Sequence, residues 1–174
     1  AMLPVVRSYA REIYTQAALE VGFPPEFTPD LEEFIRGYVS VSATQHARTS
    51  RQELQSIIST TSFTEVLNAL ELKLAEWLDK RAQKMANRQT TEGNGAFTKF
   101  AYVAGGVISL RWVTAGSATC PFCKKLNGRN IIASGNFLEA GTALESDEGK
   151  LKVQRNVGHP PAHPGCDCFI SPGT

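Results

Sequence analysis

Cys120-Pro121-Phe122-Cys123 is the first of two short stretches that hold all four cysteines of the chain, and the second is His163-Pro164-Gly165-Cys166-Asp167-Cys168. The first 119 residues contain no cysteine and one histidine. Zinc prefers thiolate and imidazole ligands, and two cysteines separated by two residues can aim both sulfurs at one ion. The two stretches therefore predict two halves of one structural zinc site that closes a small module.

Five side chains compete for the four positions of such a site: Cys120, Cys123, His163, Cys166 and Cys168. Two kinds of ligand set fit the spacing. One uses the four cysteines, and the other uses the first two cysteines with His163 and one of the last two. Either set leaves no open position for water, so the sequence favours a structural metal over a catalytic one.

Disulfides, buried free thiols and a redox-active Cys-x-x-Cys motif are the alternatives to a metal site. The N-terminus shows no basic stretch followed by an apolar one, so we expect no export signal and a reducing environment, which disfavours disulfides. Cys120 is not part of a βαβ pattern, which disfavours the redox motif.

The composition is that of an ordinary globular protein, with 42% hydrophobic and 20% charged residues. A net charge of +1 disfavours a dedicated nucleic-acid surface, although Lys124, Lys125 and Arg129 beside the first cysteine pair could contact phosphates. No apolar run has the length of about 20 residues that a membrane span needs. No arrangement of nucleophile and base stands out, so we expect a protein that is not an enzyme.

Helical periodicity dominates the first part of the chain. Residues 4–21 predict a first helix, and Thr28 is a suitable N-cap for a second. Ser50 and Glu53 form the pattern of a capping box, which predicts a short third helix.

A second capping-box pattern, Ser62 with Glu65, predicts the start of the longest helix. Its apolar face comprises Phe63, Val66, Leu67, Leu70, Leu74, Trp77, Leu78, Ala82 and Met85. Gly93-Asn94-Gly95 predicts a weak point or break, followed by a last helical piece over 97–104.

The periodicity changes near residue 106. Alternation over 107–114 predicts a half-buried strand with Ile108, Leu110 and Trp112 on its apolar face. Residues 129–133 predict a second strand, 134–150 a surface loop and 151–157 a third strand. His159 could support the metal without binding it or be solvated, and the second is the preferred expectation. The predicted fold class is α+β, with long N-terminal helices before a small antiparallel β-rich module closed by structural zinc.

Further motifs surround the two cysteine stretches. The long helix carries Arg81-Ala82-Gln83-Lys84-Met85-Ala86-Asn87-Arg88-Gln89-Thr90. The first strand carries Trp112-Val113-Thr114, and the first cysteine pair is followed by Leu126-Asn127-Gly128. Pro160-Pro161-Ala162 then leads into the second cysteine stretch. This order resembles the Mu F-like family of phage head-morphogenesis, or minor head, proteins over residues 63–170.

Periodicity predicts an N-terminal helical region over 1–62, which has no counterpart in the resemblance. The resemblance implies a Mu F-like domain over 63–174, with a long helix over 63–92 and a zinc-clipped β module over 107–170. It implies a structural minor head protein of a tailed phage or prophage, acting in capsid assembly, DNA packaging or delivery near the portal.

The partners that the resemblance implies are the portal and other head proteins, with DNA as a further candidate and no membrane or small-molecule substrate. The implied location is the capsid interior of the virion, after assembly in the host cytoplasm. Two other functions stay open: a nucleic-acid-binding zinc module, and an effector- or toxin-associated domain carried by a phage-like particle.

Overall fold

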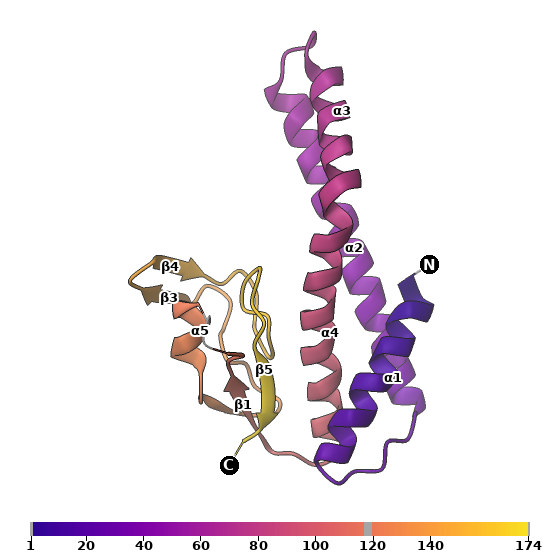
Figure 1. The fold of residues 1–174 in the computed structure, drawn as a ribbon, viewed down its shortest axis with the longest axis vertical. Coiled ribbons are helices and arrows are strands. Elements are labelled where there is room, and N and C mark those ends of the chain that lie inside the picture. The colour runs from indigo at the N-terminus through magenta and orange to yellow at the C-terminus, as the bar shows by residue number, and fades with distance from the viewer. Residues whose placement is uncertain (1, 117–119, 174) are drawn as a thin grey trace. The chain divides into compact units, whose positions relative to one another are not determined.

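A computed structural model describes residues 2–116 and 120–173 and shows the α+β class that the sequence predicts (Figure 1). The elements are α1 (Met2–Glu20), α2 (Pro29–Thr60), α3 (Val66–Glu76), the π-helical segment η1 (Trp77–Arg81), α4 (Ala82–Ala104), β1 (Ser109–Val113), α5 (Pro121–Leu126), β2 (Asn130–Ile132), β3 (Ala143–Ser146), β4 (Gly149–Lys152) and β5 (Phe169–Pro172). They form two compact units. The hairpin unit contains Thr28–Ala86 with the chain up to Arg7, and the C-terminal unit contains Ser8–Phe27 with the chain from Asn87 onward.

Helix α2 begins where the sequence predicts but continues much further. The hydroxyl of Thr28 accepts a hydrogen bond from the backbone N–H of Leu31 at 3.3 Å, as an N-cap does. The predicted third helix is wrong, because α2 runs without interruption to Thr60. Ser50 does not cap a helix; its hydroxyl donates to the backbone carbonyl of His46 at 2.8 Å, a bond that a serine makes inside a helix.

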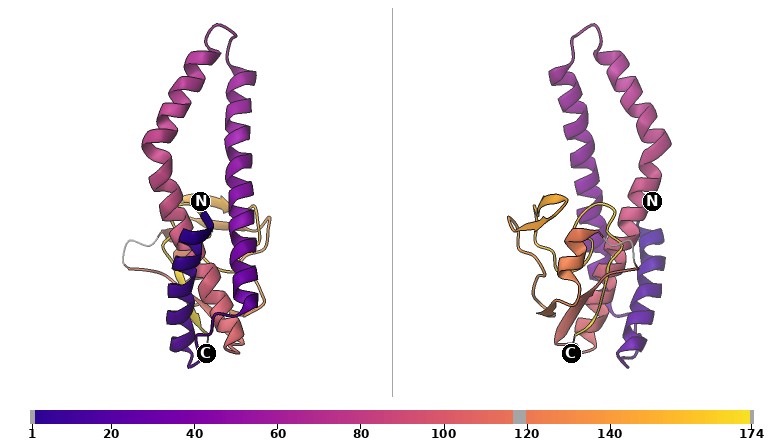
Figure 2. Two further views of the ribbon diagram at one scale, coloured as in Figure 1. Left: turned by 90° about the vertical axis from the view of Figure 1, so that its right-hand side faces the viewer. Right: turned by 60° about the vertical axis from the view of Figure 1, so that its left-hand side comes forward.

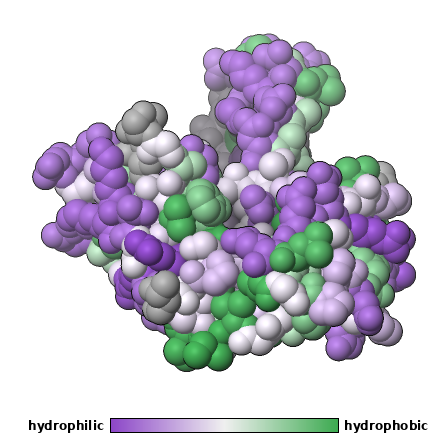
Figure 3. All heavy atoms as spheres, turned by 60° about the horizontal axis from the view of Figure 1, so that its bottom comes forward, coloured by the Kyte–Doolittle hydropathy of each residue, from purple (hydrophilic) through white to green (hydrophobic). Residues whose placement is uncertain are grey.

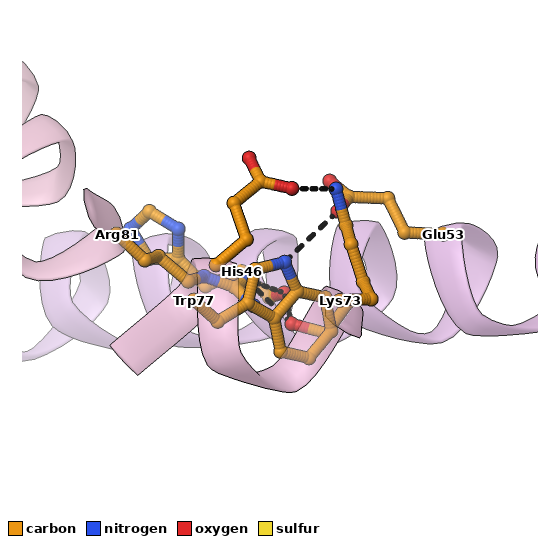
Figure 4. Close-up of polar contacts among 7 residues, drawn as sticks. His46, Glu53, Lys73, Trp77 and Arg81 are labelled. Atoms are coloured by element: carbon orange, nitrogen blue, oxygen red, sulfur yellow. Dashed lines mark hydrogen bonds and ion pairs between the residues drawn. The ribbon is translucent and has the colours of Figure 1, made fainter. Parts of the chain in front are cut away.

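Helix α2 and the helix that follows the loop over 61–65 run antiparallel as a hairpin (Figure 2). Glu53 of α2 accepts a hydrogen bond from the indole N–H of Trp77 at 3.2 Å and pairs with the ammonium of Lys73 at 3.2 Å. The guanidinium of Arg81 lies 4.2 Å from the centre of a Trp77 ring and donates to the hydroxyl of Ser50 (Figure 4). Trp77 was expected in an apolar core, but it is half-buried. It links the two helices through these polar contacts.

The start of the longest helix differs from the prediction. The hydroxyl of Ser62 donates to the Glu65 carboxylate at 2.6 Å, but α3 begins only at Val66 and its N-cap, Glu65, makes no capping bond through its side chain. The predicted capping box is therefore wrong, since its two side chains bond to each other instead of to the backbone. Part of the predicted apolar face is exposed, namely Phe63, Leu67, Leu74 and Leu78.

The predicted break at Gly93-Asn94-Gly95 is also wrong, because α4 passes through it and includes the predicted piece over 97–104. A Cβ atom on Gly95 would lie 2.6 Å from both His159 Nδ1 and the Pro160 carbonyl oxygen. The glycine thus lets residues 159 and 160 pack against the helix. His159 is not solvated as expected: its Nδ1 lies 2.7 Å from the Pro160 carbonyl oxygen, and burial lowers its pKa.

The C-terminal unit contains a three-stranded antiparallel sheet in the order β2-β1-β5. The strands β1 and β2 confirm two predictions, and Leu110 and Trp112 are buried. Ile108 is exposed, contrary to expectation, because it precedes β1 and lies at the margin of the sheet. The sequence reasoning did not find β5.

The predicted loop and third strand are partly wrong. A two-stranded hairpin of β3 and β4 occupies much of the predicted loop, and β4 ends at Lys152. Val157 instead makes an isolated antiparallel bridge with Leu138. The expected alternation over 151–157 therefore marks one short strand and a bridge.

Trp112 lies at the centre of the core of the C-terminal unit. Its ring meets Phe137 edge to face, with centroids 5.1 Å apart. Apolar side chains that stay exposed in this unit include Ile108, Ile132 and Phe169. On the face drawn in Figure 3, apolar side chains form several groups separated by hydrophilic ones. No helix within residues 2–116 and 120–173 is long and apolar enough to cross a membrane.

Gly95→Ala provides a test of the packing at α4. In an open helix position this substitution stabilises by about 1 kcal/mol. Here we expect it to lower the free energy of unfolding by about 1–3 kcal/mol, because the added methyl group overpacks against His159 and Pro160. Urea unfolding followed by circular dichroism measures the change.

Gly37→Ala is the matched control, because Gly37 lies inside α2 and a Cβ there meets nothing within 4 Å. It should stabilise the protein. Equal stabilisation by both substitutions would contradict the role of Gly95.

Candidate metal centre

The first cysteine pair lies at the start of α5. Cys120 is the N-cap, and its sulfur accepts the backbone N–H of Cys123 at 3.3 Å. Pro121 occupies the first turn, where its missing N–H has no cost. After the helix, the backbone N–H of Gly128 donates to the Trp112 carbonyl at 2.8 Å, which ties α5 to β1.

The second stretch forms a tight turn. The backbone N–H of Cys166 donates to the His163 carbonyl at 3.2 Å, and Gly165 has a φ of +77°, which favours glycine. Cys168 directly precedes β5, which pairs with β1 on the side opposite β2. Both halves of the candidate site are therefore attached to the same central strand.

All five predicted ligands lie together. The Nε2 atom of His163 is 2.9 Å from the Cys120 sulfur and 3.2 Å from the Cys123 sulfur. The Cys123 and Cys166 sulfurs are 3.6 Å apart. Ligand atoms of a tetrahedral zinc site, bound at ~2.0–2.3 Å, would be separated by about 3.5–3.8 Å. The Cys123–Cys166 separation lies in this range, and the two distances from His163 are shorter. The ligand atoms of each group lie within reach of one ion, so the cluster is compatible with a metal site.

The five ligands form two groups that share one residue. Cys120, Cys123 and His163 make one group, and Cys123, Cys166 and Cys168 make the other; within each group the ligand atoms lie within 4.8 Å of one another. Cys123 is the residue common to both, and it is buried. The arrangement keeps both predicted kinds of ligand set open and gives Cys123 a place in each.

His163 is held in the orientation that a metal ligand needs. Its Nδ1 lies 2.8 Å from the Pro164 carbonyl oxygen, to which it can donate a proton. That bond leaves the lone pair of Nε2 directed at the sulfurs. The ring also meets Phe122 edge to face, with centroids 6.4 Å apart.

The cysteine sulfurs are free thiols, so the disulfide alternative is not seen among them. A hydrogen bond from Cys123 lowers the pKa of Cys166, and the same pairing raises the pKa of Cys123. The lowered pKa of Cys166 favours the thiolate form of that residue. Thiolate is the form in which cysteine binds metals.

Trp112 offers a further donor at the cluster. In the described part of the chain, its Nε1 is buried and has no hydrogen-bond partner. It lies beside the Cys168 sulfur. An unpaired buried N–H costs free energy, and a negatively charged sulfur is a better acceptor than a thiol. This environment fits a cluster whose cysteines are thiolates, as they are when a metal is bound.

The three basic residues predicted to contact phosphates lie beside this cluster. Lys124 and Lys125 are exposed on α5, and Arg129 is exposed before β2. Arg111 of β1 also lies beside this segment, because a Cβ atom on Gly128 would be 3.5 Å from its Nη2. Sequence reasoning missed Arg111 because its place beside Gly128 depends on the pairing of β1 with β2.

A polar network on α4 was also missed. Glu92 is buried and pairs with Arg155 at 2.7 Å and Arg88 at 3.5 Å. The ammonium of Lys99 donates to the carbonyls of Gly135 at 2.9 Å and Gly158 at 3.1 Å, and burial lowers its pKa. These bonds hold the loops before and after the β3–β4 hairpin against α4. Glutamate and lysine on a helix usually face solvent, so no local pattern indicated their burial.

Comparison of the chain with known protein families, with curated proteins and with solved structures found no match.

Substitution of single ligands tests the shared position of Cys123. Titration with Co²⁺, followed by absorption of the cobalt–thiolate bonds, measures affinity and sulfur ligation. Cys123→Ser should weaken binding by at least about 100-fold, because a structural metal site gains several kcal/mol from each ligand.

Cys120→Ser and Cys168→Ser are the matched controls, since each removes a ligand of one group alone. They should weaken binding less than Cys123→Ser does. Wild-type affinity of the Cys123→Ser protein would contradict the shared position.

Proposed function

We propose that the chain is a structural minor head protein of a tailed phage or prophage, acting in capsid assembly, DNA packaging or delivery near the portal. In this proposal zinc closes the C-terminal module, and the helical hairpin binds the portal or another head protein. The resemblance of the cysteine and His-Pro motifs to Mu F-like proteins supports the phage assignment. The observation that carries a partner-binding role is an exposed apolar stripe on the hairpin.

Zinc is the metal that best suits the cluster. A set of thiolates with one imidazole is typical of tetrahedral zinc, whereas magnesium and calcium prefer oxygen ligands. Four protein ligands would leave no place for a reactive water, which gives the ion a structural role. Zinc would then join α5 to the segment before β5, and its binding energy would contribute directly to folding.

The apolar stripe consists of Phe63, Leu67, Leu74 and Leu78, which are 94%, 72%, 47% and 87% exposed. Leu67 and Leu74 are seven residues apart and lie on one side of α3. Leu78 follows four residues later in η1, and Phe63 lies in the loop before α3. At ~150–200 Å² per side chain, the exposed parts amount to roughly 500 Å² of apolar surface. Patches of this size on single proteins often mark interaction sites.

A helical partner suits this stripe because its spacing is that of a helix packed in a groove or against a second helix. The polar contacts among Glu53, Trp77 and Arg81 hold the two helices of the hairpin together without using the stripe. The stripe therefore stays available to a head protein while the hairpin keeps its own structure. The capsid interior and the host cytoplasm are the proposed locations.

Co-expression with portal and other head proteins of the same phage or prophage tests the proposal. The wild-type chain should co-purify with at least one of them, and we expect this to be the portal. A double variant, Leu67→Ser with Leu78→Ser, should reduce recovery of the complex at least about tenfold, because interface anchors each contribute 1 kcal/mol or more.

Leu72→Ser is the matched control, since Leu72 is a leucine of the same helix that is 64% exposed and lies off the stripe. This variant should retain the complex. Absence of a complex with every head protein would refute the assembly role, and equal loss with the control would refute the stripe as the binding surface.

A further inference from the structure

The C-terminal unit contains a pocket that neither the metal centre nor the apolar stripe uses. Its volume is about 210 Å³, and residues of α1, α4 and β5 line it. Small-molecule sites usually measure about 300–1,000 Å³. The pocket is therefore of a size for one long side chain and too small for a typical cofactor.

The backbone of β5 offers an unpaired peptide group to this pocket. The N–H of Gly173 donates to the Ser109 carbonyl at 2.8 Å, so these two residues form a hydrogen-bonded pair of the ladder. Hydrogen-bonded and non-hydrogen-bonded pairs alternate along antiparallel strands, which makes Ile170 and Trp112 a non-hydrogen-bonded pair. Ile170, opposite Trp112, consequently turns its own N–H and C=O away from β1. No other strand pairs with β5 in the described residues, and Ile170 is only 3% exposed. Among the described residues no backbone hydrogen bond reaches the Ile170 carbonyl, so it is an available acceptor.

The charge of the pocket is negative. Glu20 is the one ionised residue among the lining side chains, and one of its carboxylate oxygens accepts the hydroxyl of Tyr102 at 2.6 Å. Burial and this contact raise the pKa of Tyr102, which keeps the hydroxyl a donor. Glu20 is also the last residue of α1, where the helix dipole adds negative potential. No lysine, arginine or histidine among the lining residues offsets this charge.

Further lining groups suit a planar cation. The side-chain carbonyls of Gln16 and Asn94 are acceptors, and the Asn94 oxygen already accepts one bond, from Thr98 at 3.1 Å. Phe169 is a partly exposed lining residue, and a guanidinium group can stack against an aromatic ring. A guanidinium presents five donors in one plane, whereas an ammonium presents a compact set of three. Acceptors spread over three elements therefore favour the guanidinium.

We propose that this pocket binds a single arginine side chain of a partner protein, with the guanidinium between the Glu20 carboxylate and the Ile170 carbonyl and against the Phe169 ring. Binding would join α1 to β5 across the pocket. The site is separate from the stripe of Phe63, Leu67, Leu74 and Leu78, so failure of either proposal leaves the other standing.

The test uses the full chain and short blocked peptides. Acetyl-Ala-Arg-Ala-amide is titrated into ¹⁵N-labelled protein, and its citrulline counterpart supplies a neutral side chain of nearly the same shape. The arginine peptide should shift the backbone amide signal of Ile170 and the side-chain amide signals of Gln16 and Asn94. For one anchored side chain we expect a Kd of roughly 1–10 mM. The citrulline peptide should bind at least about tenfold more weakly, because the charge is lost.

Glu20→Gln should weaken binding of the arginine peptide at least about tenfold. The control is Glu12→Gln, which lies on the same helix outside the pocket lining and should leave the affinity of the peptide unchanged. Glu20 is exposed, so its substitution should not prevent folding. Equal affinity for the two peptides, equal effects of the two glutamine variants, or no shift at these signals at about 50 mM peptide would each overturn the proposal.

Discussion

The approach of the Cys120 and Cys123 sulfurs to His163, and of the Cys123 sulfur to that of Cys166, is the constraint on which the C-terminal unit depends. It joins residues 43 positions apart, and both sides of it are attached to β1. The strands of this unit are three to five residues long, so their hydrogen bonds alone give little stability. A metal ion among these ligands would fix α5 and the start of β5 to the central strand, and the buried N–H of Trp112 beside Cys168 fits charged sulfurs there.

The segment between the β3–β4 hairpin and the second cysteine stretch has its own attachments, to the loop before β3 and to α4. Val157 bridges to Leu138 of that loop through backbone hydrogen bonds. Arg155 pairs with Glu92, and His159 and Pro160 pack on the bare backbone of Gly95. These contacts lead the chain toward the cluster before any metal binds. The metal would then need to order only a short turn, which reduces the entropic cost of closing a long loop.

The parts of the structure that follow from local spacing could be predicted. They are the Thr28 cap, α1, the start of α2, β1, β2 and the five clustered ligands. Errors arose where a contact with a distant residue decides the structure. Gly95 lies inside a helix, where a glycine leaves room for His159, and β5 forms by pairing with β1. Ser50 looked like a cap, but a serine hydroxyl can equally bond to the carbonyl four residues earlier. The buried state of Glu92 depends on Arg155, which no local pattern shows.

Hydrogen exchange of the β1–β5 ladder, measured with and without the metal, tests the central claim most directly. Protein purified without chelators should contain one zinc ion per chain and protect the amides of Arg111 and Ser171, which face each other across the ladder. Removal of zinc should reduce that protection at least about 100-fold, while amides of α2 keep theirs. Zinc-free protein as purified, or unchanged protection of these amides after zinc removal, would contradict the account.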